Sequence, residues 1–145
     1  MLFGKRKRIV KRILVVEDEP LTAFDNETML RDAGYEVVAT LDGYDEAIAM
    51  LDSGRIDLIL SDVRLRSQQT GIDLARAAKA LGIPTLFATG HPYPDAPSVA
   101  VGCLMKPYSE RQLKAAIDSI DRHLGGETVK PPKGLELFPR GDDPA

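Results

Sequence analysis

The residues best suited to chemistry in this chain each follow a short apolar run. Glu17 and Asp18 come after "ILVV", Asp62 after "IDLILS" and Lys106 after "CLM", while Thr89 ends "PTLFAT". Taken singly, each has an ordinary structural explanation, because an Asp caps helices, a Thr suits a strand end and a Lys is simply exposed. Whether they do chemistry together depends on the elements that position them.

The apolar runs predict the strands of one parallel sheet. They cover residues 13–16, 36–40, 56–61, 84–89 and 103–105, and they alternate with segments compatible with helices. This alternation is typical of right-handed βαβ crossovers with helices on both faces. We therefore expect an α/β fold with a single, doubly wound, five-stranded parallel sheet.

Local signals predict the connecting helices. The first spans residues 20–33, from Pro20 to Gly34. Apolar stripes predict the next two: Tyr44, Ala47, Ile48 and Leu51 before Gly54, and Leu74, Ala78 and Leu81 before Gly82. Ser109 and Gln112 form a capping box that opens the last helix, whose apolar positions are Leu113, Ile117, Ile120 and Leu124.

The fourth crossover differs because it contains Pro92, Pro94 and Pro97. A proline costs a helix interior about 3 kcal/mol, so no helix is expected to begin before Pro97. Only residues 98–101 then remain before Gly102. The fourth helix should be short or absent.

In an open parallel sheet, ligands bind outside the carboxyl ends of the strands, where these polar residues fall. Three carboxylates about 4 Å apart would repel by roughly 4 kcal/mol per pair at an effective dielectric near 20. Such a site needs a cation, and an all-oxygen cluster suits Mg²⁺. A metal, the Lys106 ammonium and the Thr89 hydroxyl together fit a phosphoryl group, and a carboxylate can attack phosphorus to form an acyl phosphate.

With these residues at these strand ends, the sequence resembles a bacterial response-regulator receiver domain over about residues 11–125. The resemblance implies a flavodoxin-like sheet of order 2-1-3-4-5 and a sensor histidine kinase that phosphorylates Asp62. It also implies Mg²⁺ on Glu17, Asp18, Asp62 and the carbonyl of Arg64, with Thr89 and the Lys106-Pro107 pair completing the site. Such a domain catalyses only its own phosphoryl transfer and autodephosphorylation, so it is not otherwise an enzyme.

The chain departs from the family pattern at one position and resembles a subgroup at another. The family usually has an aromatic switch residue three positions before the lysine, and Cys103 stands there. Residues 87–93, "FATGHPY", resemble the "FAT GUY" subgroup of stand-alone receivers with one residue inserted. Tyr93 either substitutes for the missing ring or is an exposed loop aromatic.

The composition and the N-terminal segment indicate the location of the protein and the classes of partner to expect. A chain of 145 residues with 43% hydrophobic and 28% charged residues, one cysteine and no apolar leader fits a cytoplasmic globular domain without disulfides or membrane contact. Six of the 19 basic residues (Lys5, Arg6, Lys7, Arg8, Lys11 and Arg12) precede the first acidic one. We interpret residues 1–10 as a solvated lead-in and do not expect nucleic-acid binding.

The histidines and the C-terminal segment have mainly structural explanations. His91 fits a solvated loop, and His123 suits the last turn of a helix. Residues 126–145 are expected to form an extended or disordered tail. The apolar island "GLELF" (134–138) within it either docks on the domain or a partner, or is disordered.

Three functions therefore stay open at this stage. The first is a single-domain response regulator of a two-component phosphorelay that signals by protein contacts, since the tail is too short for a DNA-binding domain. The second is a binding scaffold that keeps the fold without the chemistry, although all expected site residues are present. The third is a small Mg²⁺ phosphohydrolase, which would need an acid or base near Asp62, where Arg64 stands.

Overall fold

The computed structural model describes residues 7–53, 55–65, 70–91 and 93–139. Its elements are β1 (Arg12–Val16), α1 (Pro20–Asp32), β2 (Glu36–Leu41), α2 (Tyr44–Ser53), β3 (Leu58–Ser61), α3 (Gly71–Ala80), β4 (Thr85–Thr89), α4 (Ala96–Val99), β5 (Gly102–Met105), α5 (Glu110–Leu124) and β6 (Leu135–Leu137). No helix in these ranges is long and apolar enough to cross a membrane.

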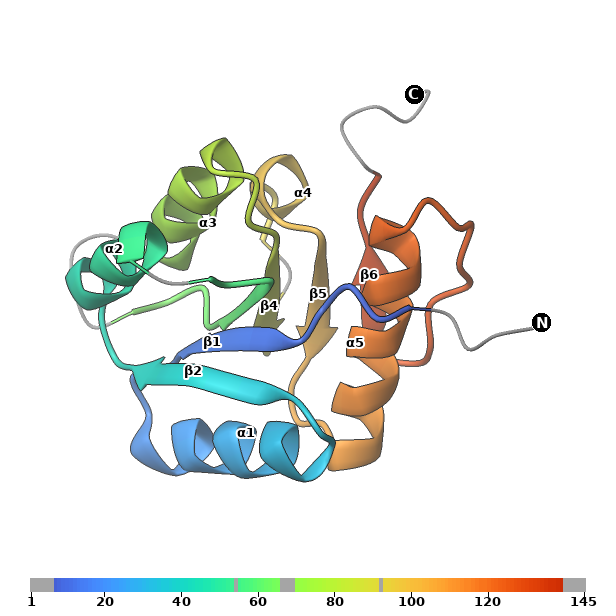
Figure 1. Ribbon diagram of the computed structural model, residues 1–145, viewed down its shortest axis with the longest axis horizontal. Coiled ribbons are helices and arrows are strands. Elements are labelled where there is room, and N and C mark those ends of the chain that lie inside the picture. Colours follow the sequence, from blue (N-terminus) through green and yellow to red (C-terminus); the bar gives the residue numbers. More distant parts are fainter. Residues whose placement is uncertain (1–6, 54, 66–69, 92, 140–145) are drawn as a thin grey trace.

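The sheet has the order β2-β1-β3-β4-β5-β6, and its first five strands are parallel. Figure 1 shows α1 and α5 on one face and α2, α3 and α4 on the other. Alternate residues of a strand serve the two faces: in β3, Leu58 and Leu60 join the core under α1 and α5, whereas Ile59 joins the core under α2 and α3. The predicted flavodoxin-like fold of order 2-1-3-4-5 is confirmed.

Two details of the predicted helices were wrong. α4 begins at Ala96, one residue before Pro97, because a proline in the first helical turn lacks only an N–H that the helix would not use. Leu81 does not join the apolar stripe of α3: it caps the helix end and is 54% exposed, while Leu74 and Ala78 are buried. The fourth helix is short, as expected from its prolines.

The N-terminal lead-in is tied to the fold by α5. The backbone N–H groups of Ile9 and Val10 donate to Oδ2 of the buried Asp121, at 2.8 and 2.7 Å. Arg8 lies over the ring of Tyr35, and Arg12 pairs with Glu36 at 2.9 Å. Lys5 and Arg6 lie outside the described residues.

The strand β6 lies in the segment for which the sequence left docking and disorder open. It pairs antiparallel with β5, and the buried side chains here are Leu135 of the strand and Phe138, which directly follows it. His123 of α5 is buried and its Nε2 lies 3.0 Å from the carbonyl oxygen of Phe138. The last turns of α5 thus contact both segments that flank the five-stranded domain. Residues 140–145 of the tail lie outside the described residues.

Candidate functional site

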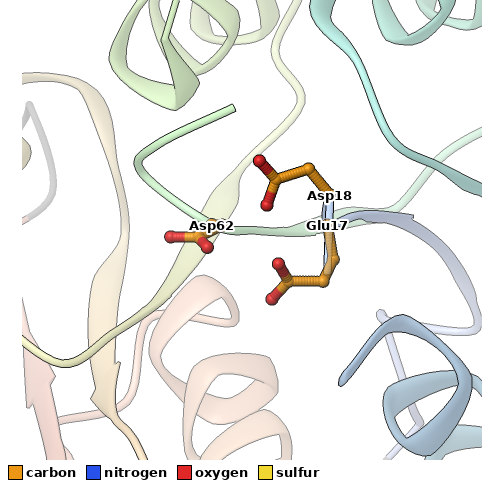
Figure 2. Close-up of side chains that lie close together, drawn as sticks. All are labelled: Glu17, Asp18 and Asp62. Atoms are coloured by element: carbon orange, nitrogen blue, oxygen red, sulfur yellow. The ribbon is translucent and has the colours of Figure 1, made fainter. Parts of the chain in front are cut away.

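Three carboxylates meet at the carboxyl ends of β1 and β3. Glu17 and Asp18 follow β1, Asp62 follows β3, and one oxygen from each lies within 4.8 Å of the others. Figure 2 shows the three side chains directed toward a common space. The structure therefore brings together the three acidic residues that the sequence singled out.

Lys106, which follows β5, places its ammonium in this cluster. Its Nζ donates to Oε1 of Glu17 at 2.9 Å and lies 3.4 Å from Oδ2 of Asp62. Burial alone would lower the pKa of Lys106, but the hydrogen bond to Glu17 and the charges of Asp62 and Glu17 raise it overall. The ammonium is thus held in its charged form beside the cluster.

The position of Glu17 makes its negative charge costly. Its side chain is 2% exposed, and burial raises the pKa of Glu17 even though Lys106 and the N–H of Glu19 act in the opposite direction. A single ammonium therefore does not fully compensate the buried charge, and a second cation would stabilise the ionised cluster.

The backbone around Asp62 is fixed by its neighbours. Its N–H donates to the carbonyl of Val16 at 3.0 Å, and Oδ1 accepts from the N–H of Arg64 at 3.3 Å. Gly71, the first residue of α3, lies so close that a Cβ there would overlap the carbonyl oxygen of Asp62. The start of α3 thus requires glycine for a steric reason.

Thr89 ends β4 on the expected edge, but its hydroxyl is engaged elsewhere. Oγ1 donates to the carbonyl of His91 at 3.0 Å and accepts from the His91 N–H at 3.2 Å. His91 itself is exposed, so its contact with the site is through its backbone. Thr89 must leave this turn to donate to a group bound on Asp62.

Tyr93 reaches the site through Arg64. The Nε of Arg64 donates to the phenol oxygen of Tyr93 at 3.1 Å, which links the residue two positions after Asp62 to the loop after β4. Tyr93 is partly buried and packs in the same apolar cluster as Cys103. It is therefore more than a freely exposed loop aromatic.

Comparison with protein families identifies the family to which a chain with this arrangement belongs. The model of the response regulator receiver domain matches residues 13–118. The chain belongs to this family. It is 31% identical over 124 residues to the chemotaxis protein CheY of Pseudomonas aeruginosa, a match that covers 79% of this chain and 99% of that protein.

Other relatives are longer than this receiver. It is 32% identical to the transcriptional regulatory protein PdtaR of Mycobacterium tuberculosis and 34% identical to the phyllosphere-induced regulator PhyR of Methylorubrum extorquens. These matches cover 76% and 55% of this chain but 56% and 31% of the relatives, respectively. The receiver thus spans about half of PdtaR and a third of PhyR.

Solved receiver structures share the fold. The chemotaxis response regulator CheY4 of Vibrio cholerae superposes with a TM-score of 0.69 at 29% identity, covering 77% of this chain and 98% of that one. The response regulator PhyR of Brucella abortus gives 0.66 at 27% identity, covering 83% of this chain and 51% of that one.

The residues of this receiver fit the divalent cation that the family implies. Glu17, Asp18 and Asp62 form an all-oxygen donor set, as Mg²⁺ prefers. A cavity of about 350 Å³ adjoins the cluster, and among the described residues its lining includes the carboxylates of Glu17, Asp18, Asp42 and Glu46 and no basic side chain. A ligand role for the carbonyl of Arg64 stays a prediction.

Two residues that no sequence pattern indicated, Tyr108 and Asn26, support the site. Tyr108, two positions after Lys106, donates its hydroxyl to Oδ1 of Asn26 at 2.6 Å. Burial, with the nearby charges of Glu17 and Asp62, raises the pKa of Tyr108 well above its ordinary value. The contact joins α1 to the loop that carries Lys106. Because Asn26 is 82 positions away in the sequence, no local pattern could have indicated the pair.

Proposed function

We propose that this receiver is a response regulator that accepts a phosphoryl group on Asp62 from a sensor histidine kinase, with Mg²⁺, and signals through protein contacts. The observation that carries the proposal is the convergence of Asp62 with Glu17, Asp18 and the ammonium of Lys106. Glu17, Asp18 and Asp62, with the carbonyl of Arg64, are the proposed metal ligands.

The proposed reaction is the attack of an Asp62 carboxylate oxygen on the phosphorus of a phosphohistidine. The new O–P bond forms as the N–P bond breaks, the leaving nitrogen takes a proton, and Asp62 becomes an acyl phosphate. Bound Mg²⁺ would neutralise phosphoryl oxygens and the cluster. Lys106 neutralises a further oxygen, and Thr89 donates a hydrogen bond after leaving His91.

The partner that delivers the phosphoryl group must approach the edge of the sheet where Asp62 lies. Two large apolar residues of α1, Leu21 and Phe24, are 74% and 65% exposed, and they follow shortly after Glu17 and Asp18 in the chain. Exposed apolar side chains of this size are typical of protein contact surfaces. We assign this part of α1 to the phosphodonor protein.

The same site supports the alternatives less well. A phosphohydrolase needs an acid or base beside the nucleophile, and the second residue after Asp62 is Arg64, whose side chain is bonded to Tyr93. A scaffold without phosphorylation would not need the acidic cluster, Thr89 and Lys106 together. We further propose a cytoplasmic location and, on the resemblance of residues 87–93, membership of the FAT GUY subgroup of stand-alone receivers.

The test is phosphorylation by a small-molecule donor. The wild-type protein and Asp62→Asn are incubated with acetyl phosphate, with Mg²⁺ or with EDTA, and intact masses are measured. We expect one added phosphoryl group on the wild type with Mg²⁺ only. Equal labelling of Asp62→Asn would contradict the proposed acceptor, and equal labelling in EDTA would contradict the metal requirement.

A further inference from the structure

The C-terminal segment supplies an aromatic ring to the apolar cluster behind the loop after β4. Phe138 is 5% exposed and packs with Phe87, Ala96 and Val99, against which Tyr93 and Cys103 are partly buried. Cys103 is small, so the space on its side of β5 is available to rings from other segments. Tyr93 of the loop and Phe138 of the tail lie in this cluster together with Phe87 of β4.

Phe138 borders two cavities. A cavity of about 620 Å³ separates the loop from the tail, and its lining includes Thr89, Tyr93, Cys103 and Phe138. A second cavity, of about 370 Å³, is lined by Pro97, Val101, His123 and Phe138 among others. Protein cores are otherwise closely packed, so a ring flanked by two cavities can change position without displacing the core.

The Phe138 end of the tail is held by the packing of its ring and by hydrogen bonds of its backbone. Its N–H donates to the carbonyl of Val101 at 2.9 Å, and its carbonyl accepts from His123. Leu135, in contrast, is part of the main core beneath α1 and α5. The connection from Gly125 to Gly134 is mostly exposed. The end at Phe138 is therefore the part that can detach locally while Leu135 remains in place.

The other ring, Tyr93, is held by groups next to the acceptor. Arg64 binds its hydroxyl, and Thr89 binds the backbone of His91 in the same loop. A phosphoryl group adds about −1.5 to −2 charges and strong acceptor oxygens, which compete for the Thr89 hydroxyl and the Arg64 guanidinium. Tyr93 would then lose its tether beside a cavity that Phe138 also borders.

We propose that residues 135–139 form a tail latch, in which Phe138 leaves its place beside Cys103 when Asp62 is phosphorylated and Tyr93 takes that space. This regulation rests on the proposed function, since it starts from the phosphoryl group on Asp62. It makes the tail a second moving part of the receiver besides the loop after β4. The β5 edge next to Phe138 is then open to other extended segments.

The chain contains no tryptophan, so Phe138→Trp places the protein's one tryptophan at the latch, where its emission can be excited selectively over the four tyrosines. We expect beryllofluoride with Mg²⁺ to shift its emission to longer wavelength and to increase its quenching by acrylamide. The same addition to Phe138→Trp with Asp62→Asn should change neither. As a measurement that needs no substitution at the latch, the amide of Phe138 in the wild-type protein should exchange hydrogen about tenfold faster with beryllofluoride.

Thermodynamic linkage between phosphorylation and latch release gives a second test, the affinity for beryllofluoride. A purely structural role of Phe138 would not increase this affinity. If phosphorylation releases the latch, then releasing the latch favours the phosphorylated arrangement by the same factor. Phe138→Ala should therefore bind beryllofluoride severalfold more tightly, whereas Lys133→Ala, an exposed change in the same tail, should bind it as the wild type does.

The outcomes separate the latch from the function on which it rests. Mass spectrometry shows independently whether acetyl phosphate labels Asp62. Labelling together with unchanged exchange at Phe138, or with unchanged affinity of Phe138→Ala, would overturn the latch and leave the proposed function standing. Absence of labelling would overturn the proposed function. It would also overturn the latch, because the latch is proposed as the regulation of that function.

Discussion

The ammonium of Lys106 lies nearer to Glu17 than to Asp62, at 2.9 Å from Oε1 of the first and 3.4 Å from Oδ2 of the second. It therefore forms its shorter ion pair with the most buried carboxylate of the cluster. A divalent cation on Glu17 and Asp18 would compete with this ion pair and leave Lys106 available to a phosphoryl group on Asp62. Lys106 and the metal thus share one carboxylate in the proposed mechanism.

Lys106→Met tests this sharing. We expect the rate of phosphorylation by acetyl phosphate to fall by about tenfold or more, because one positive charge at the developing phosphoryl charge is lost. Mg²⁺ affinity, measured by calorimetry, should not fall, because the competing ammonium is gone. Weaker Mg²⁺ binding would instead indicate that Lys106 organises the carboxylates for the metal.

Gly71→Ala tests how closely α3 positions Asp62. A Cβ at this residue would overlap the Asp62 carbonyl, so either the helix start or the acceptor must shift. We expect a loss of about 1–3 kcal/mol in the free energy of unfolding, together with slower phosphorylation. Gly43→Ala is the matched control, because a Cβ there meets only the end of the Glu46 side chain, at 3.3 Å. Equal effects of the two changes would contradict a specific role for Gly71.

The thiol of Cys103 should react slowly at neutral pH. Burial, with a smaller contribution from the charge of Glu136 on β6, raises its pKa from 9.0 to about 11. The alkylation rate of the folded protein should keep rising past pH 9, because the thiolate is the reactive form. The raised pKa also means that the folded state holds this proton more tightly than the unfolded state, so its stabilising contribution is complete below pH 9 and is lost toward pH 11. A rate that levels off near pH 9 would contradict this account.

The loop after β4 should change its dynamics on phosphorylation. In the described part of residues 90–101 the regular structure is the short helix α4, so few helical hydrogen bonds hold this loop. We expect hydrogen exchange in this loop to differ with and without beryllofluoride, since Thr89 must release His91 to reach Asp62. Unchanged exchange there, with differences only elsewhere, would show that the loop is not part of the switch.

Much of the fold and site could be predicted from the sequence because both follow local patterns. Strands such as "IDLILS" are continuous apolar runs, and a parallel sheet brings their carboxyl ends to one edge, so Asp62, Thr89 and Lys106 could be placed together in advance. The direction of the Thr89 hydroxyl is a local rotamer and hydrogen-bond choice, which residue types do not specify.

The structure of the C-terminal segment could not be predicted from local sequence patterns. β6 has only three residues, in a segment flanked by Pro132 and Pro139, and it is stabilised by β5 and α5 rather than by its own propensity. Phe138 packs in the same apolar cluster as Cys103, 35 positions earlier in the chain, and no local pattern indicates that contact. Ala96 and Leu81 were misplaced for a related reason, since the exact ends of helices are set by local capping.

The central claim is that Asp62 is the residue that accepts the phosphoryl group. An acyl phosphate is reduced by borohydride to an alcohol, which would convert a phosphorylated aspartate into homoserine and mark its position for peptide sequencing by mass spectrometry. After incubation with acetyl phosphate and Mg²⁺, the account predicts homoserine at position 62, and none when EDTA replaces Mg²⁺. Homoserine at position 18, or at another acidic residue with Asp62 unmodified, would contradict it.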